Sequence, residues 1–319
     1  MFLKGSGSLK LLFQVCFSGF LSLFLILNAY ADKGGPQAAG PVSPASYRQE
    51  LGKAVVVEEE YYPQNLDAYA RFIPPSKAKS QSGRLGLLTS ALEYSYEIKA
   101  FGKLPIELAV ATKYIGIDNS TSVELPAHLT SLDLGIETTL PFFNIAKTYL
   151  TVALAPSFYS DNWNLRSESF YLPQRYFMIY QPDEKWTFIC GVQYSPGSNI
   201  SVLPILGFIY KPNERIIFDL VPNNPEISYK LNNSWTVFSR LGITADEYKV
   251  TRNNIREIEL NYYEMRLGIG LRYALNKNIQ ASFALGSVFN HSIGYQQDSM
   301  GKVALNNGFY SEFRLGMVM

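Results

Sequence analysis

The stretch that decides the fold lies at residues 261–290, NYYEMRLGIGLRYALNKNIQASFALGSVFN. The polar triplet Asn276-Lys277-Asn278 divides it into two segments in which apolar and polar residues alternate. Because successive side chains of a β-strand point to opposite faces, the stretch predicts a β-hairpin with one apolar face. On its first strand the apolar face holds Tyr263, Met265, Leu267, Ile269, Leu271 and Tyr273, and the opposite face holds Glu264, Arg266, Gly268, Gly270 and Arg272.

The length of these strands favours lipid as the partner of the apolar face. Tyr263 and Tyr273 close its two ends. About ten residues at ~3.3 Å each span roughly 33 Å, which a tilt near 45° reduces to ~23 Å. Outer-membrane β-barrels have an apolar band of about 25 Å between aromatic girdles, whereas globular strands have about 5–6 residues. The girdle candidates are Tyr263, Tyr273, Trp186, Tyr194 and Trp235.

Composition narrows the class of protein. The chain has 319 residues and a net charge of +1, which gives no case for a nucleic-acid partner. An apolar fraction of 47% fits a barrel, because half of each strand faces the lumen. Cys16 lies in the predicted export signal, so Cys190 is expected to be alone in the mature chain, as a lipid-facing residue without a disulfide.

The N-terminus reads as an export signal. Lys4 and Lys10 precede an apolar core at residues 11–27, and Ala29-Tyr30-Ala31 is a small-residue cleavage site. An uncleaved anchor is the alternative, although the core is short for a membrane span. We therefore predict a signal peptide at residues 1–31, a flexible periplasmic leader at residues 32–53, rich in Gly, Pro, Ala and Ser, and a barrel at residues 54–319.

The alternation recurs from Leu87 to Met319, with short and long connections in turn. The last strand places Phe313, Leu315, Met317 and Met319 on one face, although outer-membrane barrels usually end on Phe. Counting segments from Leu87 gives 13. Residues 54–62 could add a fourteenth, or residues 215–231 could be one long strand. We expect an all-β, antiparallel, up-and-down transmembrane β-barrel of about 12 strands, within a range of 10–14, with residues 215–231 as one strand and loops at residues 74–83, 245–256 and 291–306.

The predicted inward face is the main functional signal. Its charged residues are Glu93, Glu97, Lys99, Glu107, Lys113, Asp133, Glu137, Arg240, Glu264, Arg266, Arg272, Glu312 and Arg314. Charged groups away from bulk water need partners or a water-filled space. The set therefore predicts either a structural salt-bridge network or a polar pore, and its mixed signs indicate no ion preference.

Enzymatic signals are weak. The two histidines, His128 and His291, lie in expected loops without a diagnostic carboxylate spacing. Gly268-Ile269-Gly270 lacks the third glycine of a dinucleotide site and the helix that would follow it, so the glycines are interpreted as making room for large lumen neighbours. We expect no catalytic, cofactor-binding or metal-binding residues.

A loose motif adds a resemblance. It comprises Pro204-Ile205-Leu206-Gly207-Phe208, Tyr210, Pro212, Asp219-Leu220-Val221-Pro222, Ile227-Ser228-Tyr229 and Leu231. This pattern resembles a family of bacterial outer-membrane β-barrels known as domain of unknown function 6268, over about residues 54–319. The resemblance implies an outer-membrane barrel and carries over no functional residue. Val221 and the pair Asn223-Asn224 lengthen the Leu-x-Pro link, a departure from the family pattern that affects the strand register around Pro222.

Together these features predict a monomeric, non-enzymatic outer-membrane barrel that acts as a narrow channel or a structural protein. Its expected partners are outer-membrane lipid and lipopolysaccharide, and the barrel-assembly machinery through the C-terminal strand. The alternatives are a barrel enzyme acting on membrane lipids and a secreted, soluble β-barrel binding protein.

Overall fold

A computed structural model describes residues 64–319, except residues 80, 101–103, 143–144, 164–166, 196–201, 223, 253–254 and 298–299. The predicted signal peptide, leader and strand at residues 54–62 lie outside the described residues.

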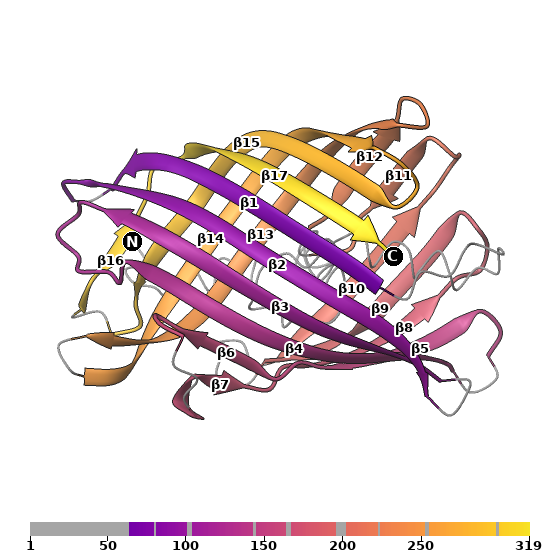
Figure 1. Ribbon diagram of the computed structural model, residues 1–319, viewed down its shortest axis with the longest axis horizontal. Helices are drawn as coiled ribbons and strands as arrows, with labels where there is room; N and C mark the ends of the chain where they lie inside the picture. Colours follow the sequence, from indigo (N-terminus) through magenta and orange to yellow (C-terminus); the bar gives the residue numbers. More distant parts are fainter. Residues whose placement is uncertain are drawn as a thin grey trace, which may run out of the picture.

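The described chain forms one antiparallel sheet that closes on itself (Figure 1). Its strand segments are β1 (Gln64–Lys77), β2 (Arg84–Ala100), β3 (Leu104–Asn119), β4 (His128–Pro141), β5 (Thr148–Leu154), β6 (Ser157–Ser160), β7 (Phe170–Tyr171), β8 (Gln174–Tyr180), β9 (Trp186–Tyr194), β10 (Val202–Tyr210), β11 (Ile216–Asp219), β12 (Glu226–Lys230), β13 (Trp235–Arg252), β14 (Ile255–Ala274), β15 (Ile279–Tyr295), β16 (Lys302–Ala304) and β17 (Gly308–Val318). The pairs β5–β6, β7–β8 and β16–β17 each continue one strand, so the barrel has 14 strands. A short 3-10 helix, η2 (Ser167–Ser169), precedes β7.

The first and last strands close the barrel. β1 pairs with β17 from Asn65↔Val318 to Phe72↔Ser311, and Met319 N donates to Gln64 O at 2.9 Å. The short turns lie at the end of the barrel that also holds the C-terminus. Ile279, next to the β14–β15 turn, pairs with Met317 near that terminus. We call this the turn end and the opposite end the loop end.

The expected range of strand numbers includes the observed 14, but the preferred number of 12 is too low. β11 and β12 are separate strands, and β1 is a strand that the alternation did not predict. Pro74 and Pro75 were expected in a loop, yet β1 continues past them. The register of β1 against β2 shifts between Ile73 and Ser76, and such a bulge accommodates prolines that cannot donate to a regular ladder.

The predicted loop at residues 245–256 is wrong for most of its length. β13 continues to Arg252 and β14 begins at Ile255. The polar residues that suggested a loop pair across the two strands, and Lys249 forms an ion pair with its cross-strand neighbour Glu259. The predicted loop positions of His128 and His291 are also wrong, since both lie in strands.

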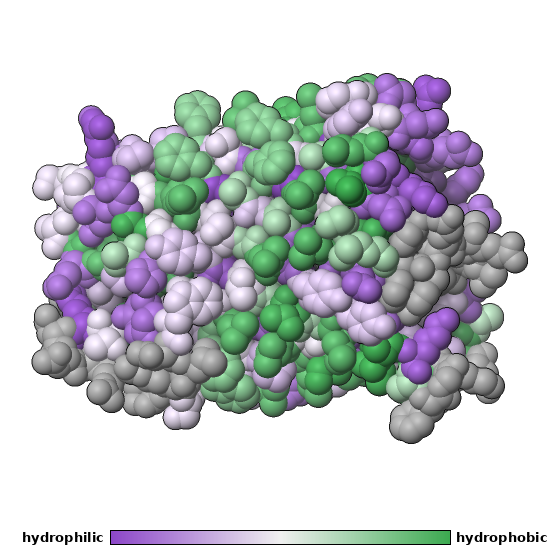
Figure 2. Space-filling view, viewed as in Figure 1, coloured by the Kyte–Doolittle hydropathy of each residue, from purple (hydrophilic) through white to green (hydrophobic). Residues whose placement is uncertain are grey.

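The outside of the barrel is apolar around its middle and hydrophilic at its ends (Figure 2). Leu267 and Ile269 of the opening hairpin are 51% and 66% exposed. At the turn end, aromatic side chains pack at the rim: Trp235 lies tilted against Tyr273 at 4.6 Å between ring centroids, and Trp186 stacks on Tyr210 at 4.1 Å. The predicted girdle residues Tyr194 and Tyr263 lie on β9 and β14, and Tyr194 is exposed. No helix in the described part of the chain is long and apolar enough to cross a bilayer.

The inside of the barrel changes character along its axis. Near the loop end, inward side chains form an apolar cluster that includes Ile73, Leu85, Leu129, Val250, Ile293 and Tyr310. Closer to the turn end the inward side chains of β1, β2, β13, β14 and β17 are mostly charged, whereas those of β8–β10 are apolar. The charged part is the candidate site.

Candidate functional site

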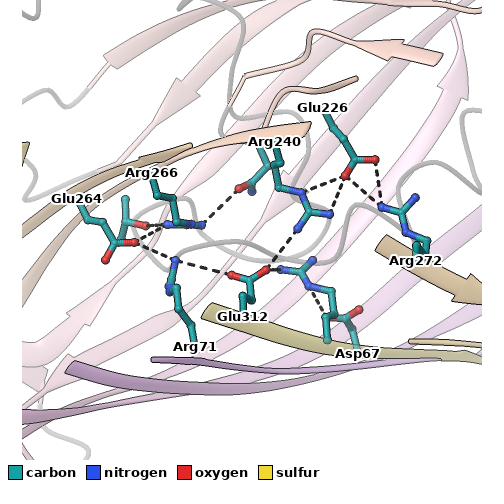
Figure 3. A network of polar contacts seen from close by, with 11 residues as sticks. Asp67, Arg71, Glu226, Arg240, Glu264, Arg266, Arg272 and Glu312 are labelled. Carbon is teal, nitrogen blue, oxygen red and sulfur yellow. Dashed lines mark hydrogen bonds and ion pairs between the residues drawn. The ribbon is translucent and has the colours of Figure 1, made fainter. Parts of the chain in front are cut away.

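Ion pairs cross the lumen from one wall to another (Figure 3). Arg71 Nη1 of β1 lies 2.9 Å from Glu264 Oε1 of β14, although β17 and β15 separate these strands in the sheet. Arg240 Nη1 of β13 lies 3.4 Å from Glu312 Oε1 of β17, again across two intervening strands. These ion pairs run through the interior of the barrel and join strands that are not adjacent in the wall.

Glu226 is the centre of the turn-end side of this network. Its Oε2 accepts hydrogen bonds from Arg240 Nε at 3.0 Å and Arg240 Nη2 at 2.7 Å. Arg272 Nη2 lies 3.1 Å from both carboxylate oxygens. Two guanidinium groups on one buried carboxylate are strong, charge-assisted contacts.

Arg266 forms the loop-end side. Its Nη1 donates to Glu264 Oε1 at 2.6 Å and to Thr244 Oγ1 at 3.0 Å. Gly242 leaves the space for this guanidinium, since a Cβ there would lie 2.6 Å from Arg266 Cζ. Tyr262 donates a hydrogen bond to Glu264, so one fully buried carboxylate is contacted by two arginines and a tyrosine.

Arg314 completes the network with longer contacts. Its Nη2 is 3.6 Å from Glu312 Oε1, and its Nε is 3.9 Å from Asp67 Oδ1. Its guanidinium carbon also lies 5.2 Å from the centre of the Tyr69 ring. We call the nine residues Asp67, Arg71, Glu226, Arg240, Glu264, Arg266, Arg272, Glu312 and Arg314 the lumen network; five arginines face four carboxylates.

A second polar group lies between the lumen network and the apolar cluster. Lys113 of β3 and Asp246 of β13 form an ion pair at 2.5 Å across the barrel. Tyr248 donates a hydrogen bond to Asp246 at 3.3 Å. The Tyr159 ring packs edge-on against the Tyr248 ring, with 5.5 Å between the ring centroids. The polar part of the lumen therefore ends at Tyr159 and Tyr248, which belong to the apolar cluster.

Most of the charged residues predicted on the inward face are buried inside the barrel. The buried ones are Glu93, Glu107, Lys113, Asp133, Glu137, Arg240, Glu264, Arg266, Glu312 and Arg314. Glu97 and Arg272 are half-buried, and Lys99 is exposed near the β2–β3 turn. Sequence reasoning missed Asp67, Arg71, Glu226 and Asp246. Asp67 and Arg71 alternate with Ala68 and Ala70, a pattern that signals an inward polar face only weakly.

The interpretation that Gly268 and Gly270 make room for large neighbours in the lumen is correct. A Cβ on Gly268 would lie 2.1 Å from Tyr310 Oη, and one on Gly270 would lie 2.4 Å from Phe238 Cζ. These glycines leave space for aromatic side chains inside the barrel.

The two histidines do not meet in one site. His128 stacks on Tyr114, whose side chain is exposed on the outside, at 5.4 Å. His291 is 2% exposed inside the barrel, edge-on to Tyr262 at 5.6 Å. Among the described residues, no group of three or more His, Cys, Asp or Glu side chains is placed to hold a metal ion.

A closed barrel of 14 antiparallel strands, apolar outside and charged inside, defines the class of outer-membrane channel-like β-barrels. The chain belongs to the family Domain of unknown function (DUF6268), whose model matches residues 105–318. No curated protein sequence matches it.

Solved structures that resemble the chain share little sequence with it. The COG4313 outer membrane channel from Pseudomonas putida F1 is 11% identical, with 82% of this chain and 97% of that chain covered and a TM-score of 0.45. A Pseudomonas aeruginosa FadL homologue is 11% identical, with 91% and 98% covered and a TM-score of 0.45. The Pseudomonas putida toluene transporter TodX is 8% identical, with 93% and 99% covered and a TM-score of 0.38.

Proposed function

We propose that this protein is a non-enzymatic barrel of the bacterial outer membrane that forms a narrow channel for small polar solutes. The observation that carries the proposal is the charged lumen inside an apolar exterior. Side chains alone fill a barrel of about 8 strands, and barrels of about 16–18 strands enclose an aqueous channel. A barrel of 14 strands lies between these sizes.

The lumen network also suggests how wide the channel is. Ion pairs that cross the interior, such as Arg71–Glu264, reduce the open cross-section. Both signs of charge line the path, so size and polarity are expected to select solutes more than net charge does. The same ion pairs favour a second candidate function, that of a purely structural barrel that does not conduct.

Two experiments test this proposal. Unboiled, detergent-extracted protein should migrate differently from boiled protein on a gel, as folded outer-membrane barrels do. Planar-bilayer recording of the refolded protein should then show small single-channel steps. A protein that is heat-modifiable but never conducts would leave the structural role, and a mature chain soluble without detergent would exclude the membrane location.

The other predicted properties belong to the same proposal. Lipid and lipopolysaccharide surround the apolar band, and the C-terminal strand is the part that the barrel-assembly machinery contacts. The competing lipid enzyme is tested by assaying hydrolysis of envelope lipids with the wild type, His128→Ala and His291→Ala. Activity that either substitution abolishes would overturn the non-enzymatic assignment.

A further inference from the structure

The barrel wall is shortest at β11 and β12. β11 has four residues and β12 has five, whereas the flanking strands β10 and β13 have nine and 18. The last rungs of this section are Asp219↔Glu226 and Glu226↔Arg240. The chain between the two short strands therefore leaves the wall partway along the barrel. Leu220 N still donates to Phe208 O, and Pro225 O still accepts from Leu241 N, so these two residues remain in the wall. We call the described residues between them, 221, 222 and 224, the inner connection.

The inner connection folds into the lumen. Val221 is fully buried and packs with the apolar inner surface of β8–β10, formed by Phe177, Ile179, Ile189, Ile205 and Ile209. These residues alternate along their strands with exposed, lipid-facing ones such as Phe188 and Leu206. A side chain that packs on this surface must lie inside the barrel.

Two glycines make room for this arrangement. On one side, a Cβ at Gly207 would lie 3.2 Å from Val221 Cα and 3.3 Å from Pro222 Cδ, tighter than ordinary contact. On the other side, Arg266 lies flat over Gly242. Its Nη2 reaches Asn224 Oδ1 at 3.5 Å.

We propose that the inner connection is the constriction of the lumen and sets the size limit for solutes that pass through it. The inference rests on the proposed channel function. The connection is anchored to one wall by Val221 and faces the lumen network with Asn224, beside the Glu226–Arg240 pair. Asn224 is buried against Arg266, so a solute that passes this level has to part an amide from a guanidinium group. Both groups can donate hydrogen bonds to the oxygens of small polar molecules.

Cysteine modification tests the inference directly. Asn224→Cys is made in a Cys190→Ser background, since Cys190 is the free thiol of the described chain. A bulky methanethiosulfonate reagent added to the bilayer chamber is expected to lower the single-channel current in discrete steps. Ile227→Cys is the matched control, because Ile227 is three residues away but 46% exposed on the lipid side. Its modification should leave the current unchanged.

A second variant approaches the same element from its anchor. Val221→Gly removes the side chain that holds the connection against β8–β10, and its conductance should exceed that of the parent. Val221→Gly also tests the inference if Asn224→Cys is not heat-modifiable and therefore does not fold. Parent channels that conduct, but are unaffected by modification at position 224 and unchanged by Val221→Gly, would refute the constriction. A parent that never conducts would instead refute the channel function.

Discussion

Arg240→Gln is expected to destabilise the barrel by about 3 kcal/mol. The guanidinium is almost fully buried and makes three contacts, two to Glu226 and one to Glu312. Removing one partner of a buried ion pair costs about 3–5 kcal/mol, because the other charge is left without compensation. Here Glu226 keeps Arg272 and Glu312 keeps Arg314, so we expect the lower end of that range.

The effect is measurable by urea unfolding of the protein in lipid vesicles, followed by tryptophan fluorescence. A loss of about 3 kcal/mol lowers the folding equilibrium constant roughly 100-fold. With an m value of about 3 kcal/mol/M, the midpoint falls by about 1 M. Arg215→Gln is the control, because Arg215 is exposed in the β10–β11 turn and its loss should change stability by less than about 0.5 kcal/mol.

A double-mutant cycle separates the pair from its surroundings. Arg240→Gln with Glu226→Gln should lose less stability than the sum of the single variants, with a coupling energy of about 0.5–3 kcal/mol. Additive losses, together with an Arg240→Gln effect no larger than that of Arg215→Gln, would show that lumen water screens the network. The network would then not hold the walls together.

Three further substitutions test the outside and the inside of the barrel, each by the same unfolding assay. Leu267→Arg places a charge on the lipid face near the middle of the apolar band and should cost about 2–4 kcal/mol of stability. Leu275→Arg, at the turn end, should cost only about 0–1 kcal/mol. Equal costs would contradict the placement of the membrane. Trp235→Ala removes one ring of the tilted Trp235–Tyr273 pair and should cost at least about 0.5–1.5 kcal/mol, and no change would deny the pair a stabilising role. Gly268→Ala should cost about 1–3 kcal/mol because its methyl group meets the Tyr310 hydroxyl, and Tyr310→Phe in the same chain should recover part of the loss.

The lipid-facing surface was the part most open to prediction. An outward position within the bilayer must be apolar. The outward orientation of Leu267, Ile269 and Leu271 can therefore be inferred for each residue from its type alone. Beyond the band this rule no longer holds, because water covers the outside. The strand ends around Lys249 and Arg252 therefore looked like a loop although they are paired.

The partners inside the lumen were beyond prediction for a different reason. Arg71 and Glu264 are 193 residues apart in sequence, and they meet only because the barrel closes with a particular register. An inward charge can be recognised from alternation alone, but its partner depends on the number of strands and their stagger. The inner connection was equally hidden, since Val221 and Pro222 read as the irregular end of a strand.

The closing seam between β1 and β17 has a consequence for the order of assembly. Apart from a single bridge between Ser160 and Lys249, the other strand pairings among the described residues join strands that follow one another closely. This seam instead joins segments about 250 residues apart, at an entropic cost of about 5 kcal/mol. Neighbouring hairpins are therefore expected to form first and the seam last. Until it forms, the sheet has two open edges whose unpaired amides and carbonyls can capture strands of other molecules. The pairing of β1 with β17, from Asn65↔Val318 to Phe72↔Ser311, thus completes the barrel and removes both edges.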